Sequence, residues 1–176
     1  SSALPWEQAA FIRSRASAGD KLLGERFLQA IQPFIWRRSL DFRQLREIGA
    51  MSDRIRDHYA QGQAFGAGYD LKRGRGGIRE IEFFTQVHQL IYGGRDISLR
   101  PAATIDALAA LAKVGRVDPE IAARLTDHYA VLRRIEHRLQ MIDDQQTHLL
   151  PQQAGALDAV ARLDGLEDGA ALLALL

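Results

Sequence analysis

The stretch KRGRGGIREIEFF, residues 72–84, holds residue types that could do chemistry. Its cations are separated by glycines and lead directly into an apolar helical pattern. Small residues let backbone amides approach a phosphate, and a helix N-terminus favours negative charge. The stretch therefore predicts an anion site. The candidate phosphate-binding or interface residues here are Lys72, Arg73, Arg75, Gly76, Gly77 and Arg79.

The same stretch has a simpler interpretation as a solvated basic loop. It is not a Walker A loop, because no Gly-Lys-Ser/Thr follows the glycines. It is not a dinucleotide-binding fingerprint either, because no apolar strand precedes it. The pattern by itself favours the solvated loop, so the anion site needs support from elsewhere.

Two carboxylates, Glu80 and Glu82, follow the glycines. If Gly77 is the N-cap of the helix, Glu80 falls at the third helical position, where its carboxylate can accept a bond from the cap amide. Helical geometry places Glu80 within the apolar arc and Glu82 in the polar stripe. A buried carboxylate needs a cation or several hydrogen bonds, so we expect a structural ion pair or a cap. The candidate partners of Glu80 are Arg133, Arg134 and the arginines of WRR at 36–38.

Helices must position these residues, because helical periodicity runs through nearly the whole chain and no segment alternates long enough to be a strand. We predict an all-α fold, a helical bundle of roughly six to eight helices. Asp20 and Asp118 are expected N-caps, and Gly115 is an expected helix end. The expected helices are two within 5–32, the first over 5–17 and the second ended by a break at Pro33. One each is expected over 41–60, 78–92, 102–114 and 119–146, and one or two after Pro151.

The composition is that of a globular protein, with 47% hydrophobic and 26% charged residues in 176. We expect one helical domain over 1–176. A net charge of +1 argues against general affinity for nucleic acid or acidic membranes. The chain has no cysteine and no apolar run near the ~20 residues that span a bilayer, which favours a cytoplasmic location. It opens on SSALPWEQAA and ends on AALLALL, as an excised piece of a longer chain would.

The histidines do not predict a metal site, because none has a partner ligand four residues on. No catalytic residue is assigned, since the serines of SRASAGDK lack a nucleophile elbow. We expect His128 and Glu136 on the inner face of the long helix, in a buried polar network that is structural or transmits a signal. The five histidines are His58, His88, His128, His137 and His148.

The stretch LKRGRGGIREIEFFTQVHQLIYGGR closely resembles the helical region of the bacterial glutamine synthetase adenylyltransferase family, bifunctional enzymes that add AMP to glutamine synthetase and remove it. Further similarities follow in the family's order, at WEQAAFIRSRASAGD (6–20), PFIWRRSLDF (33–42) and RRIEHRLQMIDDQQTHLLP (133–151). Related uridylyltransferases share a looser version of the glycine-arginine-glutamate motif. Residues 152–176 carry no pattern that we can place.

The resemblance implies a particular place in the parent enzyme. The family has two nucleotidyltransferase domains, each followed by a helical domain, and their Gly-Ser and Asp-x-Asp motif holds Mg²⁺. This sequence lacks that motif, because Asp143 and Asp144 are adjacent and late in a helical row. The resemblance therefore implies a helical domain behind a catalytic domain, more like the deadenylylating N-terminal half. Such a segment is expected to be inactive alone, with ATP and Mg²⁺ used by the full-length enzyme.

The resemblance also implies that the domain forms a wall of the nucleotidyltransferase cleft and couples the two catalytic halves. Arg13, Arg15 and the loop at 72–77 are then expected to approach that interface. The implied partners are the missing catalytic domains, glutamine synthetase and a PII-type regulatory protein, with no nucleic acid and no membrane. The alternative is a stand-alone helical module that binds a PII-type regulator or glutamine synthetase without touching nucleotide.

Overall fold

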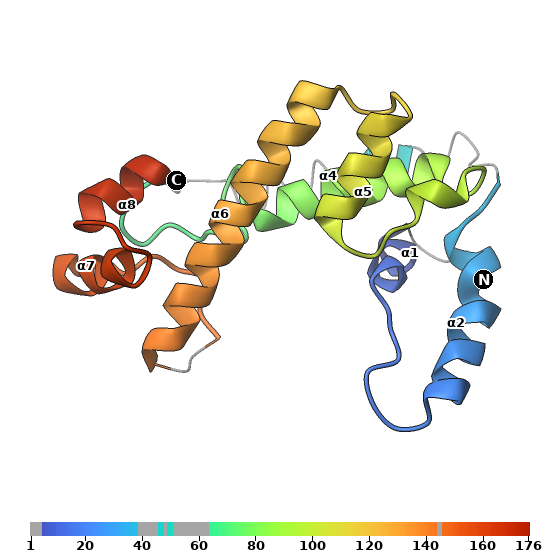
Figure 1. Cartoon of the computed structure of the whole chain (residues 1–176), viewed down its shortest axis with the longest axis horizontal. Helices are drawn as coiled ribbons and strands as arrows, with labels where there is room; N and C mark the ends of the chain where they lie inside the picture. Colours follow the sequence, from blue (N-terminus) through green and yellow to red (C-terminus); the bar gives the residue numbers. More distant parts are fainter. Residues whose placement is uncertain (1–4, 39–45, 48, 51–63, 144–145) are drawn as a thin grey trace. The chain divides into compact units, whose positions relative to one another are not determined.

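The computed structural model describes residues 5–38, 46–47, 49–50, 64–143 and 146–176 (Figure 1). Within these residues there is no β-strand, and one isolated antiparallel bridge pairs Asp70 with Leu149. The predicted all-α class is confirmed. The helices are α1 (Pro5–Ile12), α2 (Lys21–Ile35), α4 (Ile78–Tyr92), the 3-10 turn η1 (Ile97–Leu99), α5 (Thr104–Lys113), α6 (Pro119–Asp143), α7 (Ala154–Leu163) and α8 (Gly169–Leu175).

The chain divides into two compact units, which are described separately. Unit 1 comprises Ser1–Arg54 and Glu82–Ala123, and unit 2 comprises Ile55–Ile81 and Arg124–Leu176. The single domain over 1–176 stays a prediction. Most of the helix expected over 41–60 lies outside the described residues. None of the helices that the structure describes is long and apolar enough to cross a membrane.

Local sequence signals explain most helix boundaries. Asp20 caps α2, because its Oδ1 accepts a hydrogen bond from the Leu23 amide at 3.0 Å. Asp118 caps α6 in the same way through the amides of Glu120 and Ile121. Gly115 follows α5 with a φ of 68°, the left-handed conformation that favours glycine at a helix end. These three predictions are confirmed.

Two expected boundaries near the N-terminus are wrong. Helix α1 ends at Ile12, not near residue 17, and the following segment packs on α2 so closely that a Cβ on Gly24 would lie 2.6 Å from the Cβ of Ala16. Pro33 does not break α2, which continues to Ile35. The helix tolerates this proline near its end because burial of Ile35 and Trp36 stabilises the last turn.

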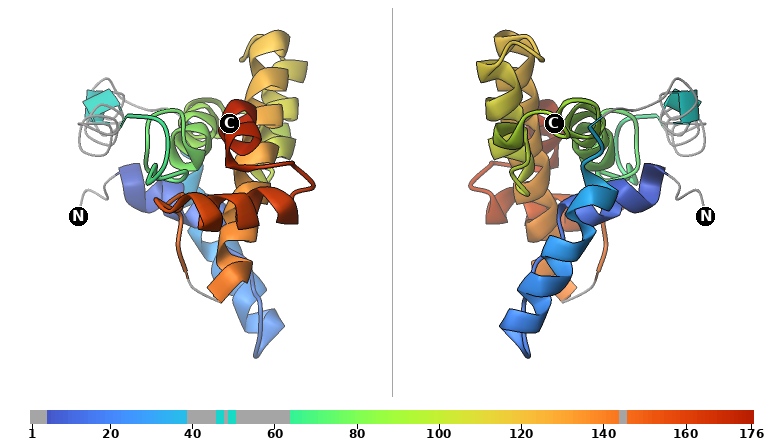
Figure 2. Two further views of the ribbon diagram at one scale, coloured as in Figure 1. Left: turned by 90° about the vertical axis from the view of Figure 1, so that its left-hand side faces the viewer. Right: turned by 90° about the vertical axis from the view of Figure 1, so that its right-hand side faces the viewer.

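Each unit has its own apolar core. In unit 1, Ala9, Ile12, Ile35, Trp36 and Leu90 form one buried cluster. Leu99, Leu111, Val117 and Ala122 form a second cluster in the same unit. In unit 2, α7 and α8 pack side by side, and Gly169 lies against Leu157 (Figure 1, Figure 2). The fully buried apolar residues of unit 2 include Leu71, Ile78, Ile135, Leu150, Val160 and Leu172.

Candidate functional site

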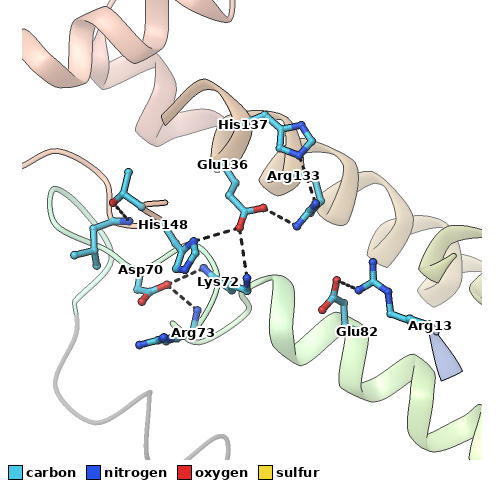
Figure 3. A network of polar contacts seen from close by, with 11 residues as sticks. Arg13, Asp70, Lys72, Arg73, Glu82, Arg133, Glu136, His137 and His148 are labelled. Carbon is cyan, nitrogen blue, oxygen red and sulfur yellow. Dashed lines mark hydrogen bonds and ion pairs between the residues drawn. The ribbon is translucent and has the colours of Figure 1, made fainter. Parts of the chain in front are cut away.

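The candidate site begins with the basic loop, residues 70–77, which lies in unit 2 directly before α4. Asp70 organises its first turn, since Oδ1 of Asp70 accepts hydrogen bonds from the amides of Lys72 at 2.9 Å and Arg73 at 2.8 Å (Figure 3). The carbonyl of Asp70 accepts from the Gly74 amide. This arrangement is an Asx turn, in which an aspartate replaces a backbone acceptor.

The amides at the start of α4 also have acceptors within the chain. The carboxylate of Glu80 accepts a hydrogen bond from the Gly76 amide at 2.9 Å, and the carbonyl of Gly74 accepts one from the Gly77 amide at 3.0 Å. The Ile78 amide donates to the Leu71 carbonyl. The amides of Gly76 and Gly77 thus have acceptors within the chain, and the expected role of these two glycines in an anion site stays a prediction. An anion at this loop would therefore be bound by its side chains and not by these amides.

The glycines of the loop have a structural reason. A Cβ on Gly74 would overlap the ring of Tyr69 and lie 2.6 Å from the Asp70 carbonyl oxygen. A Cβ on Gly77 would lie 2.7 Å from the carbonyl oxygen of Leu71. Such contacts are too close for any other residue, so these two glycines let the chain fold back on itself.

Tyr69 closes the loop from inside. Its side chain is buried, and its hydroxyl donates a hydrogen bond to the carbonyl of Arg75. Burial raises the pKa of this phenol, and the negative charges of Glu80 and Asp70 raise it further. The loop is therefore fixed at two points, by the bonds of the Asp70 carboxylate at its start and by the Tyr69 hydroxyl at Arg75.

Glu136 of α6 is the buried charge beside the loop, with a side chain that is 2% exposed. Its Oε2 lies 2.7 Å from Nη1 of Arg133, and its Oε1 lies 3.3 Å from Nδ1 of His148 and 3.9 Å from Nζ of Lys72 (Figure 3). Neither Oε2 of Glu136 nor Nδ1 of His148 has aligned hydrogen-bond geometry. We call Lys72, Arg133, Glu136 and His148 the Glu136 cluster.

Backbone pairing brings His148 to this cluster. The Leu71 amide donates to the carbonyl of His148 at 2.9 Å, and the Leu150 amide donates to the carbonyl of Tyr69 at 2.9 Å. The segment after α6 thus runs beside the start of the basic loop. The expected buried position of Glu136 is confirmed. The expected buried position of His128 is wrong, because eight residues of α helix separate the two by about 80° around the axis and His128 is exposed.

The ion pairs of the predicted residues differ from those expected. Arg133 contacts Glu136, and Arg134 contacts Asp164 with its Nε 2.8 Å from Oδ1. Glu80, for which both arginines were candidate partners, has the capping bond instead. In unit 1, Nη1 of Arg13 lies 2.5 Å from Oε1 of Glu82 (Figure 3).

The remaining predicted cations lie at the surface. Arg15, Arg73, Arg75 and Arg79 are exposed, and the side chain of Lys72 is 37% exposed. His58 and Asp144 lie outside the described residues. Among the residues that are described, no three histidines or carboxylates are placed to hold a metal ion.

Sequence reasoning missed three organising residues, Asp70, Tyr69 and His148. Asp70 had a local signal, because an aspartate two positions before a glycine-rich turn is typical of an Asx turn. His148 had none, since it reaches Glu136 only through pairing of two segments more than 70 residues apart. Tyr69 likewise acts through a turn whose path the sequence does not specify.

Comparison with known proteins places the chain in a family. Among its relatives are bifunctional glutamine synthetase adenylyltransferase/adenylyl-removing enzymes of Caulobacter vibrioides (51% identical over 160 residues, 91% of this chain) and Agrobacterium fabrum (47% over 163 residues, 93% of this chain). The enzyme of that name from Xanthobacter autotrophicus is 44% identical over 171 residues, 97% of this chain. The resemblance seen in the sequence is confirmed. The matched region is 16%, 16% and 17% of these relatives, so the chain spans about a sixth of their length.

A family model described as GlnD PII-uridylyltransferase matches residues 48–175. That range contains the whole basic loop, all of α6 and the segment that carries His148. Because the match covers most of the chain, the chain belongs to the GlnD PII-uridylyltransferase family.

Proposed function

We propose that this chain is the helical segment of an enzyme that adenylylates and deadenylylates glutamine synthetase. In this proposal the basic loop forms part of the wall of a nucleotidyltransferase cleft, and another part of the parent protein supplies the catalytic carboxylates with ATP and Mg²⁺. The segment also couples the two catalytic halves, with a PII-type protein as regulator. The names of the relatives support the assignment of the parent protein as such an enzyme.

One observation carries the role of the loop. Its backbone is fixed by internal hydrogen bonds and by contact of Lys72 with the buried Glu136, while the side chains of Arg73 and Arg75 stay exposed. A guanidinium group binds phosphate through two parallel hydrogen bonds, and a fixed backbone lowers the entropy lost on binding. A rigid loop with outward-facing guanidinium groups suits the edge of a cleft that holds phosphates.

The test uses a full-length enzyme that contains this segment. We expect Arg75→Gln, Lys72→Ala and Arg15→Ala each to lower the deadenylylation rate, roughly tenfold for loss of one charged contact to phosphate. The matched control is Arg124→Gln, which removes an exposed arginine from α6. Circular dichroism of the 176-residue chain should show the helices retained. Unchanged deadenylylation in all three variants would remove the proposed role of the loop.

One observation favours the alternative, a protein-binding module. The side chains of Leu22, Leu23 and Phe27 on α2 are 59%, 64% and 50% exposed, which is high for large apolar residues. Under this alternative the chain binds purified glutamine synthetase or a PII-type protein directly, Leu23→Glu abolishes that binding, and the three basic-residue variants leave it unchanged. Biolayer interferometry without nucleotide distinguishes the two functions.

A further inference from the structure

A second glycine-arginine stretch lies in unit 1, in the turn between α4 and α5 (Figure 1). It starts at Gly93 and Gly94 and touches the chain that follows α2. A Cβ on Gly93 would lie 2.8 Å from Cζ3 of Trp36, and one on Gly94 would overlap the carbonyl oxygen of Arg37. The glycine pair therefore lets two distant segments, both bearing arginines, come into direct contact.

Two arginines in this turn are held by their Nε atoms. Nε of Arg95 donates to the carbonyl of Arg38 at 2.9 Å, and Nε of Arg100 donates to the carbonyl of Gly93 at 2.6 Å. Arg100 also stacks on Trp36, with its Cζ 5.2 Å from the ring centroid. A guanidinium bonded through Nε still has its two Nη groups as donors.

A third arginine, Arg116, lies beside the same turn. Its Cζ is 4.6 Å from the ring centroid of Tyr92, the residue that directly precedes Gly93. The carbonyl of Tyr92 accepts the Arg95 amide at 3.0 Å, so this residue joins the two arginines. Stacking on an aromatic ring fixes the plane of a guanidinium and leaves its edges available. We call Arg95, Arg100 and Arg116 the arginine cluster.

The nearby carboxylate, Asp96, does not pair with the cluster. Its Oδ1 accepts hydrogen bonds from the amide and the hydroxyl of Ser98 at 2.9 and 2.6 Å. These bonds hold the pKa of Asp96 below its ordinary value, and the charges of Arg116 and Arg100 lower the pKa further. The ion pairs among the described residues involve other arginines. Two guanidinium groups, those of Arg100 and Arg116, therefore act on a carboxylate that already has other donors.

We propose that the arginine cluster binds a phosphate-bearing anion. The three arginines carry more positive charge than the single carboxylate of Asp96 balances, and a multiply charged anion is favoured beside such an excess. Phosphate matches the cluster because it accepts paired Nη donors from more than one arginine. The contacts through Nε or an aromatic ring hold all three side chains before binding, which lowers the entropy lost. This proposal does not rest on the proposed function.

Calorimetry of the 176-residue chain with inorganic pyrophosphate, without divalent metal, tests the proposal. We expect one binding site, with affinity roughly tenfold weaker in Arg95→Gln and in Arg116→Gln, because each loses charged hydrogen bonds. Arg26→Gln on α2 and Arg124→Gln on α6 remove exposed arginines elsewhere and should bind like the wild type. Arg100→Lys keeps the charge and loses the planar fork, so it should also bind more weakly.

Several results would overturn the proposal. They are absence of pyrophosphate binding, equal loss of affinity in the cluster and control variants, and a loss caused by Arg75→Gln of the basic loop instead. Nuclear magnetic resonance of the Arg95 and Arg100 Nε–H groups locates the ligand independently of folding. Binding of an aspartate-rich peptide without any response to pyrophosphate would likewise contradict the assignment.

Comparison of orthophosphate, tripolyphosphate and ATP then identifies the source of the phosphate. Equal affinity for tripolyphosphate and ATP means that the cluster binds the phosphate groups and makes no contact with the nucleoside. Tighter binding of ATP means that the nucleoside adds contacts. Both results support a phosphate site. Because the cluster contains no grouped carboxylates, added Mg²⁺ should not strengthen binding of either ligand.

Discussion

The basic loop of unit 2 and the arginine cluster of unit 1 start from similar sequence, glycines beside arginines, and use their cations differently. In the basic loop, Lys72 faces the buried carboxylate of Glu136, and the loop amides are bonded within the chain. In the arginine cluster, backbone carbonyls and aromatic rings hold the guanidinium groups, and the carboxylate of Asp96 accepts hydrogen bonds from Ser98. In the first region a buried carboxylate faces the cation, whereas in the second the carboxylate of Asp96 accepts its hydrogen bonds from Ser98.

The difference shows that a glycine-arginine pattern indicates close packing of the backbone, and that the pattern alone does not indicate a ligand. In both regions a glycine is required because a Cβ would meet a carbonyl oxygen. Whether the neighbouring cations remain available to an anion depends on where a carboxylate lies in the fold. Four experiments test this comparison, from the largest expected effect to the smallest.

The largest effect is expected for Gly94→Ala. The new Cβ would overlap the carbonyl of Arg37, and backbone cannot move aside cheaply, so we expect unit 1 to lose about 3 kcal/mol of stability. Gly76→Ala in the basic loop should cost only about 1 kcal/mol, since its φ of 78° is strained but the space is open. Hydrogen exchange followed by residue measures both. Equal losses would break the contrast between the two glycine positions.

The Glu136 cluster should give the next largest effect. We expect Glu136→Gln to destabilise the chain by about 2 kcal/mol, less than a fully buried pair because Lys72 and Arg133 are about one-third exposed. Arg95→Gln, which loses no carboxylate contact, should stay within about 0.5 kcal/mol. Urea unfolding measures both. A double-mutant cycle with Lys72→Met should give a coupling of about 0.5–1 kcal/mol, and zero coupling would show that Lys72 does not depend on Glu136.

A smaller effect is expected at alkaline pH from Tyr69. The folded-state pKa is raised above the ordinary value of 10.0, so the stability linked to the neutral phenol is fully present below pH 10 and is lost as pH rises through the folded value. Tyr69→Phe should therefore lose about 1 kcal/mol at neutral pH, from the missing bond to Arg75, and less above pH 10. The measurement is the difference in unfolding free energy between the two proteins from pH 8 to 11. A difference that is independent of pH would contradict it.

The smallest effect is expected at acid pH from Asp96. Its folded-state pKa is lowered below the ordinary value of 3.8, so its contribution is present above pH 3.8 and is lost as pH falls through the folded value. Ser98→Ala removes the side-chain bond, which is the largest cause, and should move the pKa back toward 3.8. Carboxyl titration by nuclear magnetic resonance measures the shift. An unchanged pKa would mean that the backbone amide of residue 98 and the arginines, and not the Ser98 hydroxyl, stabilise the charge of Asp96.

Sequence reasoning located those features whose cause is local. The helix predicted over 78–92 is observed at Ile78–Tyr92, because its apolar arc has helical spacing and glycines flank both ends. The cap at Asp118 follows from one side chain and the amides two and three residues on. Pro33 was misjudged, because its local cost is outweighed by burial of residues on the next turn. The sequence pointed to the cations of the basic loop by residue type, but it predicted neither their contacts nor the residues that organise the loop.

The sequence by itself determined the helical class, most helix boundaries and the family resemblance, since each depends on spacing within a few turns or on motifs read in order. Only the tertiary structure decided which charges meet. Arg13 contacts Glu82 across 69 residues, and Lys72 and His148 reach Glu136 from separate segments. Coulomb attraction depends on distance in space, and spacing along the chain does not encode that distance once the segments fold back on one another.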